Sequence, residues 1–121
     1  FRRVLFRSTY KQTYEEELAA DAKLPTRGVE RLAVFVNWCK SNKVDGFLGE
    51  FGVPNTDPRW STVVMENFLK ALDAAGMGGT YWAAGEIWGR YPLSVHPTEG
   101  FKKDAVQMEV LLKHLGTGAG K

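Results

Sequence analysis

The chain has 121 residues, with 16 lysines and arginines against 14 aspartates and glutamates, and a formal net charge of +2. This length suits one small domain, and 44% hydrophobic with 25% charged residues is the balance of a folded protein rather than of a disordered tail. A charge this small does not argue for nucleic-acid binding, and no apolar run approaches the roughly 20 residues of a membrane span. The single cysteine, Cys39, excludes a disulfide framework within the chain.

The first eight residues, FRRVLFRS, differ in character from the rest of the chain. They contain three arginines, without which the chain has 13 basic and 14 acidic side chains and a net charge of −1. The octet has no helical or strand period and resembles the in-frame translation of a sequencing-library adapter. We therefore expect residues 1–8 not to be native, the alternative being a basic N-terminal arm. At the other end, residues 117–121 are expected to be a frayed tail.

The first half of the remaining chain predicts a helix followed by a strand. Residues 9–24 are polar and predict a loop or a short helix. Thr26, in the turn residues 25–28, is a candidate N-cap for a helix of about three turns, with Cys39 as a core thiol. A short apolar run at residues 44–51 then predicts a buried strand. The apolar stripe of the helix comprises Val29, Leu32, Ala33, Val36 and Cys39, widened by Phe35 and Trp38.

The second half repeats this pattern. Asp57 and Pro58 predict a helix start, with Asp57 as N-cap, and Gly76 is suited to end that helix in the left-handed conformation. Residues 79–84 predict a second strand, and residues 85–101 a long loop rich in glycine, proline and aromatic residues. The apolar face of the helix between them comprises Trp60, Val64, Phe68, Ala71, Leu72 and Ala75.

A last helix is expected to begin near Asp104, with Gln107 three residues later as in a capping box, and to end at Gly116. Its predicted stripe comprises Met108, Leu111, Leu112 and Leu115. Strands that alternate with helices predict parallel βαβ units, so the expected fold class is α/β. Because two strands alone do not make a stable parallel sheet, we expect the chain to be part of a larger α/β domain.

A carboxylate follows each predicted strand, where parallel α/β folds gather their catalytic groups. Glu50 ends the first strand within GFLGEFG, and Glu86 lies just past the second within YWAAGEIWG. The glycines at positions 49 and 52 allow backbone or ligand to approach Glu50 closely. A carboxylate in an apolar strand is costly unless it is paired or functional, so Glu50 is either an ion-paired strand terminus or a functional group. For Glu86 the pattern favours a solvated loop acid.

Aromatic side chains gather on and after the second strand, namely Trp82, Trp88 and Tyr91. An indole stacks flat on the apolar C–H face of a sugar and offers one N–H donor, so these residues suit carbohydrate binding, although Trp82 could instead belong to a core. Trp60 is expected in the core. His96 and His114 lie 18 residues apart and do not predict a zinc pair, and no metal or cofactor is indicated.

The phrases GFLGEFGVPNTDPRW and LDAAGMGGTYWAAGEIWGRYPLS, taken together, resemble the C-terminal part of glycoside hydrolase family 5, above all its bacterial endoglucanases. The resemblance covers residues 9–115. It implies a partial (β/α)8 TIM barrel, with residues 9–116 spanning helix six to helix eight with strands seven and eight. Thr9 and Tyr10 would be the remnant of the loop after strand six. A complete barrel takes roughly 250 residues, so the chain is expected to be about its last third.

The same resemblance implies roles for the site residues. Glu50 would be the catalytic nucleophile and Trp82 the platform for the sugar beside the cleavage point, while Trp88, Glu86 and Tyr91 would line the substrate site. Retaining glycosidases need a second carboxyl as acid and base, and the family's Asn-Glu-Pro phrase is absent from this chain. The resemblance therefore implies a fragment of a retaining β-1,4-glucanase that is inactive alone.

The implied partner is a polysaccharide or oligosaccharide, with no cofactor, metal, nucleic acid or membrane. The parent protein is expected to be monomeric and, because its substrate lies outside the cell, secreted or periplasmic. Three alternatives remain open from the sequence. They are a mannanase or mixed-linkage glucanase of the same fold, a non-catalytic carbohydrate-binding barrel, and an unrelated α/β domain with a coincidental GEFG.

Overall fold

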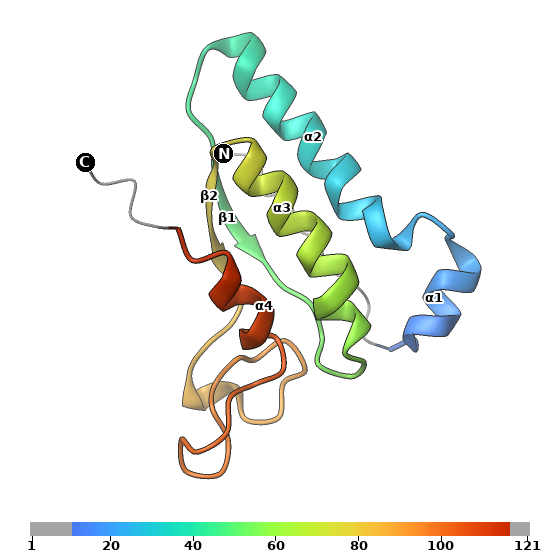
Figure 1. Cartoon of the computed structure of the whole chain (residues 1–121), viewed down its shortest axis with the longest axis vertical. Coiled ribbons are helices and arrows are strands. Elements are labelled where there is room, and N and C mark those ends of the chain that lie inside the picture. The colour runs from blue at the N-terminus through green and yellow to red at the C-terminus, as the bar shows by residue number, and fades with distance from the viewer. Residues whose placement is uncertain (1–10, 117–121) are drawn as a thin grey trace.

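The computed structural model describes residues 11–116, so the expectations for residues 1–8, for Thr9 and Tyr10 and for residues 117–121 lie outside the described part. The elements in chain order are α1 (Tyr14–Ala20), α2 (Leu24–Asn42), β1 (Phe47–Phe51), a π-helical segment η1 (Trp60–Met65) continuing into α3 (Glu66–Ala74), β2 (Gly78–Tyr81), a 3-10 turn η2 (Glu86–Trp88), and α4 (Met108–Lys113). The long helix α2 packs against the helical segment of η1 and α3, and α3 lies next to the strands; the loop after the second strand lies beyond the carboxyl ends of both strands (Figure 1).

The two strands pair in parallel, which confirms the α/β class and the parallel arrangement predicted from the alternation. Both strands are shorter than predicted. The first begins at Phe47 because Val44, at 47% exposure, lies outside the core. The second ends at Tyr81 because Ala83 turns away from β1: its N–H donates to the carbonyl of Leu93 and its own carbonyl accepts from Val95.

The helices α1 and α2 form the N-terminal part of the described chain. Thr13 and Glu16 make a reciprocal capping box, so the short-helix alternative for the first segment is the right one. The second helix begins at Leu24, and Thr26 lies inside it and donates to the carbonyl of Lys23, so its predicted role as N-cap is wrong. The reason is Pro25, whose fixed φ suits the first helical turn.

The buried stripe of α2 is narrower than predicted. Cys39 is buried, as expected of a core thiol. The prediction that Trp38 widens the stripe is wrong, because this side chain is 55% exposed and lies on the outer face together with Val34, one turn earlier. Leu24, Gly28 and Leu32 recur every fourth residue and carry the packing instead. No helix within residues 11–116 combines the length and the apolar character needed to cross a membrane.

The core lies between the sheet and the segment formed by η1 and α3. Trp60 is fully buried, as predicted, and is joined by Phe68 and by the strand residue Phe51, whose rings lie 5.6 Å apart. The helical segment begins at Trp60 with Arg59 as its N-cap, so the predicted N-cap Asp57 lies two residues too early, although its side chain accepts the backbone N–H of Arg59 at 2.9 Å. Gly76 has the left-handed φ of 62° predicted for it. The predicted helix is thus present, but its first turns are π-helical rather than α-helical.

The last helix differs most from expectation. It begins at Met108, and Gln107 makes no capping box because its side chain is buried and bonded to two loop carbonyls. This anchor fixes the rotation of α4, so Val110, one turn after Gln107, is the buried apolar residue. The predicted stripe is therefore wrong for Leu112 and Leu115, which are 53% and 64% exposed.

Candidate active site

Glu50 lies at the carboxyl end of β1, where the ladder to β2 is irregular. Leu48 pairs with Gly79 and Phe51 with Tyr81, so β1 advances by three residues while β2 advances by two. The extra residue is a β-bulge, a feature that re-aims side chains and is common beside active sites. Because of it, Leu48 and Phe51 both face the helical core, at 3% and 7% exposure. In a regular strand, residues three apart would face opposite sides of the sheet.

The structure brings Glu50 and Trp82 to the same end of the sheet. The N–H of Trp82 donates to the carbonyl of Phe51 at 2.7 Å, which fastens the start of the second loop to the end of β1. The rings of Phe51 and Tyr81 meet edge to face in the core, 5.6 Å apart. Their chain neighbours Glu50 and Trp82 are not among the residues of this buried core. Glu50 is half-buried, and Trp82 is 37% exposed.

The glycines on either side of Glu50 do two different things. A methyl group on Gly52 would lie 2.3 Å from the carbonyl oxygen of Trp82 and 3.3 Å from Leu93, so only glycine admits this backbone approach. At Gly49, by contrast, nothing lies within 4 Å of the place that a methyl group would take. The predicted close backbone approach therefore occurs at Gly52, while Gly49 leaves open space next to Glu50.

Three aromatic side chains after β2 form a continuous group, called here the aromatic row (Trp82, Trp88 and Tyr91). The rings of Trp82 and Trp88 lie 4.9 Å apart at 67°, and those of Trp88 and Tyr91 lie 5.3 Å apart at 33°. The peptide bond after Trp82 is cis. Glu86 stands on the same short turn, η2, as Trp88 and is exposed, as predicted for a solvated loop acid.

Comparison with known proteins places this arrangement in context, although no protein-family model matches the chain. A curated relative from Aspergillus oryzae, named "Probable endo-beta-1,4-glucanase B", is 35% identical over 92 residues, or 75% of this chain and 27% of that protein. Endo-β-1,4-glucanase A of Emericella nidulans is 34% identical over 76 residues, or 62% of this chain and 23% of that protein. Among solved structures, Pseudomonas stutzeri endoglucanase Cel5A in complex with cellobiose has a TM-score of 0.71 and 38% identity, covering 80% of this chain and 29% of that chain.

The chain is similar in sequence to endo-β-1,4-glucanases and in structure to part of endoglucanase Cel5A. It spans about a quarter of the length of the curated relatives it matches. These matches confirm the resemblance inferred from the GEFG and YWAAG phrases. They also support the α/β fold, because the chain matches part of these solved enzyme structures.

A residue that sequence reasoning did not assign to the site joins the two loops. Gln107 is fully buried, and its amide nitrogen donates to the carbonyl of Val53 at 3.3 Å and to that of Pro92 at 3.1 Å. The hydroxyl of Tyr81 also donates to Val53, at 3.0 Å, and burial raises the pKa of Tyr81 to about 12. The available signal was a lone amide side chain directly before an apolar helical stripe.

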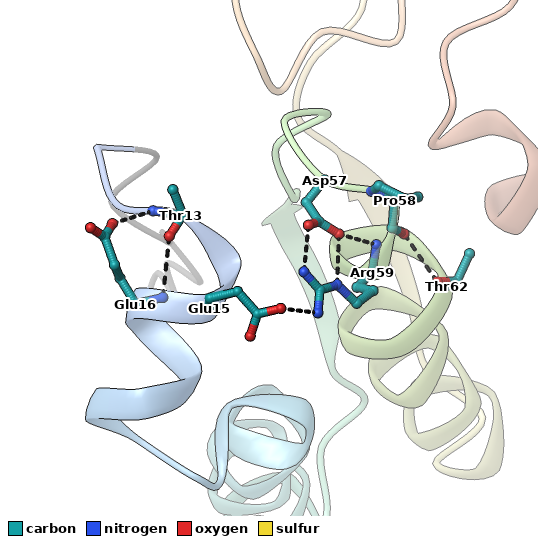
Figure 2. A network of polar contacts seen from close by, with 7 residues as sticks. All are labelled: Thr13, Glu15, Glu16, Asp57, Pro58, Arg59 and Thr62. Carbon is teal, nitrogen blue, oxygen red and sulfur yellow. Dashed lines mark hydrogen bonds and ion pairs between the residues drawn. The ribbon is translucent and has the colours of Figure 1, made fainter.

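The loop after β1 is also held from the side of α1, as Figure 2 shows. The guanidinium of Arg59 donates two hydrogen bonds to Asp57, at 3.0 and 2.8 Å, and pairs with Glu15 on α1. Its carbon lies 4.4 Å from the ring centroid of Tyr14, so the cation also stacks on that ring. The hydrogen bonds from Arg59 lower the pKa of Asp57. One arginine thus ties the N-terminal helix to the loop that follows Glu50.

The two histidines lie in separate structural settings. His114, whose side chain is 10% exposed, joins α4 to α3 by contacts of 2.6 Å with Asp73 and 3.2 Å with Glu66. Burial opposes its charged form, but the hydrogen bonds to both carboxylates raise its pKa overall. His96 contacts the ring of Phe101, 5.3 Å away. Within residues 11–116, no three His, Cys, Asp or Glu side chains form a group that could hold a metal ion.

Proposed function

We propose that the chain is the C-terminal part of a retaining β-1,4-glucanase in which Glu50 is the nucleophile. One observation carries the proposal. A half-buried carboxylate and the aromatic row lie at the carboxyl ends of two parallel strands, in a chain similar to endoglucanases. We propose that β1 and β2 correspond to strands seven and eight of a complete barrel.

The proposed reaction uses two carboxyl groups in two steps. In the first, an oxygen of Glu50 attacks the anomeric carbon while the bond to the leaving sugar breaks, and an acid gives its proton to the departing oxygen. In the second, the same group removes a proton from water, and the water oxygen displaces Glu50. We propose that the acid/base carboxyl comes from a part of the protein outside these 121 residues, so the chain alone is inactive.

The aromatic row would bind the sugar chain. Trp82 is placed to stack on the sugar beside the cleaved bond because its neighbour Tyr81 faces the core. Trp88 and Tyr91 extend the same apolar surface, and the exposed Glu86 can accept hydrogen bonds from sugar hydroxyls at its edge. The names of the relatives support β-1,4-glucan as the substrate. Because such a polymer lies outside the cell, we propose that the enzyme is exported, and we propose that it is a monomer.

The test is made in the full-length protein that carries this chain. Glu50→Gln is expected to lower turnover of a soluble β-1,4-glucan by several orders of magnitude and to leave oligosaccharide binding intact. Glu30→Gln, which changes an exposed carboxylate on α2 that pairs with Lys23, is the matched control and should retain turnover. Near-normal turnover of Glu50→Gln would refute the assignment.

A second variant distinguishes a nucleophile from an acid/base. In Glu50→Ala, added azide is expected to enter the space that the carboxylate leaves and to attack the anomeric carbon from the same side. An activated β-glucoside substrate should then give the α-glycosyl azide, with turnover partly restored. A β-glycosyl azide would show that Glu50 is instead the acid/base and would overturn its assigned role.

A further inference from the structure

Gln107 connects three segments that lie far apart in the sequence. It directly precedes α4, its partner Val53 follows β1, and its partner Pro92 lies in the loop after β2. Both partners are carbonyl oxygens, which only accept hydrogen bonds, so the orientation of the amide is fixed with its nitrogen toward them. The side chain is fully buried, so water does not compete for these two bonds.

The fold of the two loops does not depend on Gln107 alone. The carbonyl of Val53 also accepts from the hydroxyl of Tyr81, and the carbonyl of Pro92 also accepts from the N–H of Asn55, at 2.8 Å. Each carbonyl therefore keeps one donor when Gln107 is replaced. What is lost is a buried side chain that bonds to both loops at once and reinforces the direct bond between them from Asn55 to Pro92.

These two loops carry the two halves of the proposed site. Val53 follows Glu50 by three positions, and Pro92 directly follows Tyr91 of the aromatic row. We propose that Gln107 is a positioning residue, which holds the end of β1 and the aromatic row at a fixed separation so that a stacked sugar presents its anomeric carbon to Glu50. This inference rests on the proposed function for its consequence in catalysis.

The experiment compares two substitutions in the full-length protein. Gln107→Met keeps the length and burial of the side chain but removes both donors, and we expect kcat/KM to fall by about 10- to 100-fold, with kcat falling and KM rising together. In Gln107→Glu, an ionised carboxylate faces two carbonyl oxygens, so the loss should be larger at neutral pH. At acidic pH its protonated form can donate one hydrogen bond, so activity relative to wild type should partly recover. Gln12→Met, at an exposed position, is the control and should behave as wild type.

A readout that needs no activity separates this inference from the proposed function. Backbone hydrogen exchange in Gln107→Met should accelerate at residues 53–56 and 83–95, whereas exchange in α2 and α3 should stay at the wild-type rate. Unchanged exchange in both loops, or acceleration spread evenly over all helices, would overturn the positioning role. If the wild-type protein hydrolyses no β-glucan while the two loops respond as expected, the proposed function fails and the role of Gln107 in holding the loops stands.

Discussion

Gly52 offers a sharp test of how the two strand ends are held together. A methyl group at this position would lie 2.3 Å from the carbonyl oxygen of Trp82, about 1 Å closer than a normal contact. Because that oxygen belongs to the backbone, the overlap is relieved only if the loop after β2 moves away from β1. We expect Gly52→Ala to cost about 1–3 kcal/mol from overpacking. Weakening the 2.7 Å bond between Trp82 and Phe51 should add about 1 kcal/mol.

The measurement is urea unfolding of the full-length protein followed by kinetics. A loss of about 3 kcal/mol lowers the unfolding midpoint by about 1 M at a slope of about 3 kcal/mol/M. Since Trp82 would move by roughly 1 Å relative to Glu50, kcat/KM should also fall, by about 100-fold.

Gly49→Ala is the matched control, because nothing lies within 4 Å of the added methyl group. It makes the same change in the conformational freedom of the unfolded chain, which is worth about 0.4–1 kcal/mol in favour of the folded state. An unchanged midpoint for Gly52→Ala would refute the reasoning. So would an equal loss in both variants, because the cause would then not be contact with Trp82.

Three further predictions concern the scaffold and the aromatic row. Because the pKa of His114 is raised in the folded state, its contacts stabilise the fold fully below the unfolded pKa of about 6.5. This contribution is lost as the pH rises through the folded pKa. In urea unfolding, His114→Gln should therefore be more destabilising at pH 5 than at pH 9. Arg59→Lys removes the two-bond contact with Asp57 and the stacking on Tyr14, and should speed hydrogen exchange in α1, whereas Lys70→Arg on the exposed side of α3 should not. Trp60→Ala should cost about 3–5 kcal/mol in unfolding free energy, while Trp88→Ala should mainly weaken oligosaccharide binding in calorimetry; equal effects of the two on stability would contradict the separation of core and aromatic row.

Local sequence patterns were sufficient where structure depends on near neighbours. The spacing of Trp60, Val64 and Phe68 predicted a buried helical face, and the alternation of helices and strands predicted that the two strands pair in parallel. Those inferences rest on periodicity and on the geometry of βα units, which hold without knowledge of distant contacts.

The same patterns failed where a distant partner decides the outcome. The capping box at the last helix was locally plausible, but the amide of Gln107 bonds to carbonyls 54 and 15 residues earlier in the chain. Those partners fix the rotation of α4 and move its buried face from Leu112 to Val110. The π-helical start at η1 and the β-bulge at Glu50 have likewise no signature in the spacing of apolar residues.

The bulge affects how strongly β1 prefers one pairing register with β2. In a flat ladder from the same starting pair, Leu48 and Glu50 would share the helical face, and Phe51 would turn outward. That alternative would force a carboxylate among Phe68 and Leu72 and would expose an aromatic ring, so it is penalised twice. The polar side chain of Glu50 therefore helps to select the bulged register of β1. An apolar residue at this position would remove one of the two penalties. A loss of activity in Glu50→Leu could then come from the missing carboxylate or from a shifted strand register. Glu50→Gln keeps a polar side chain, which still disfavours the flat ladder.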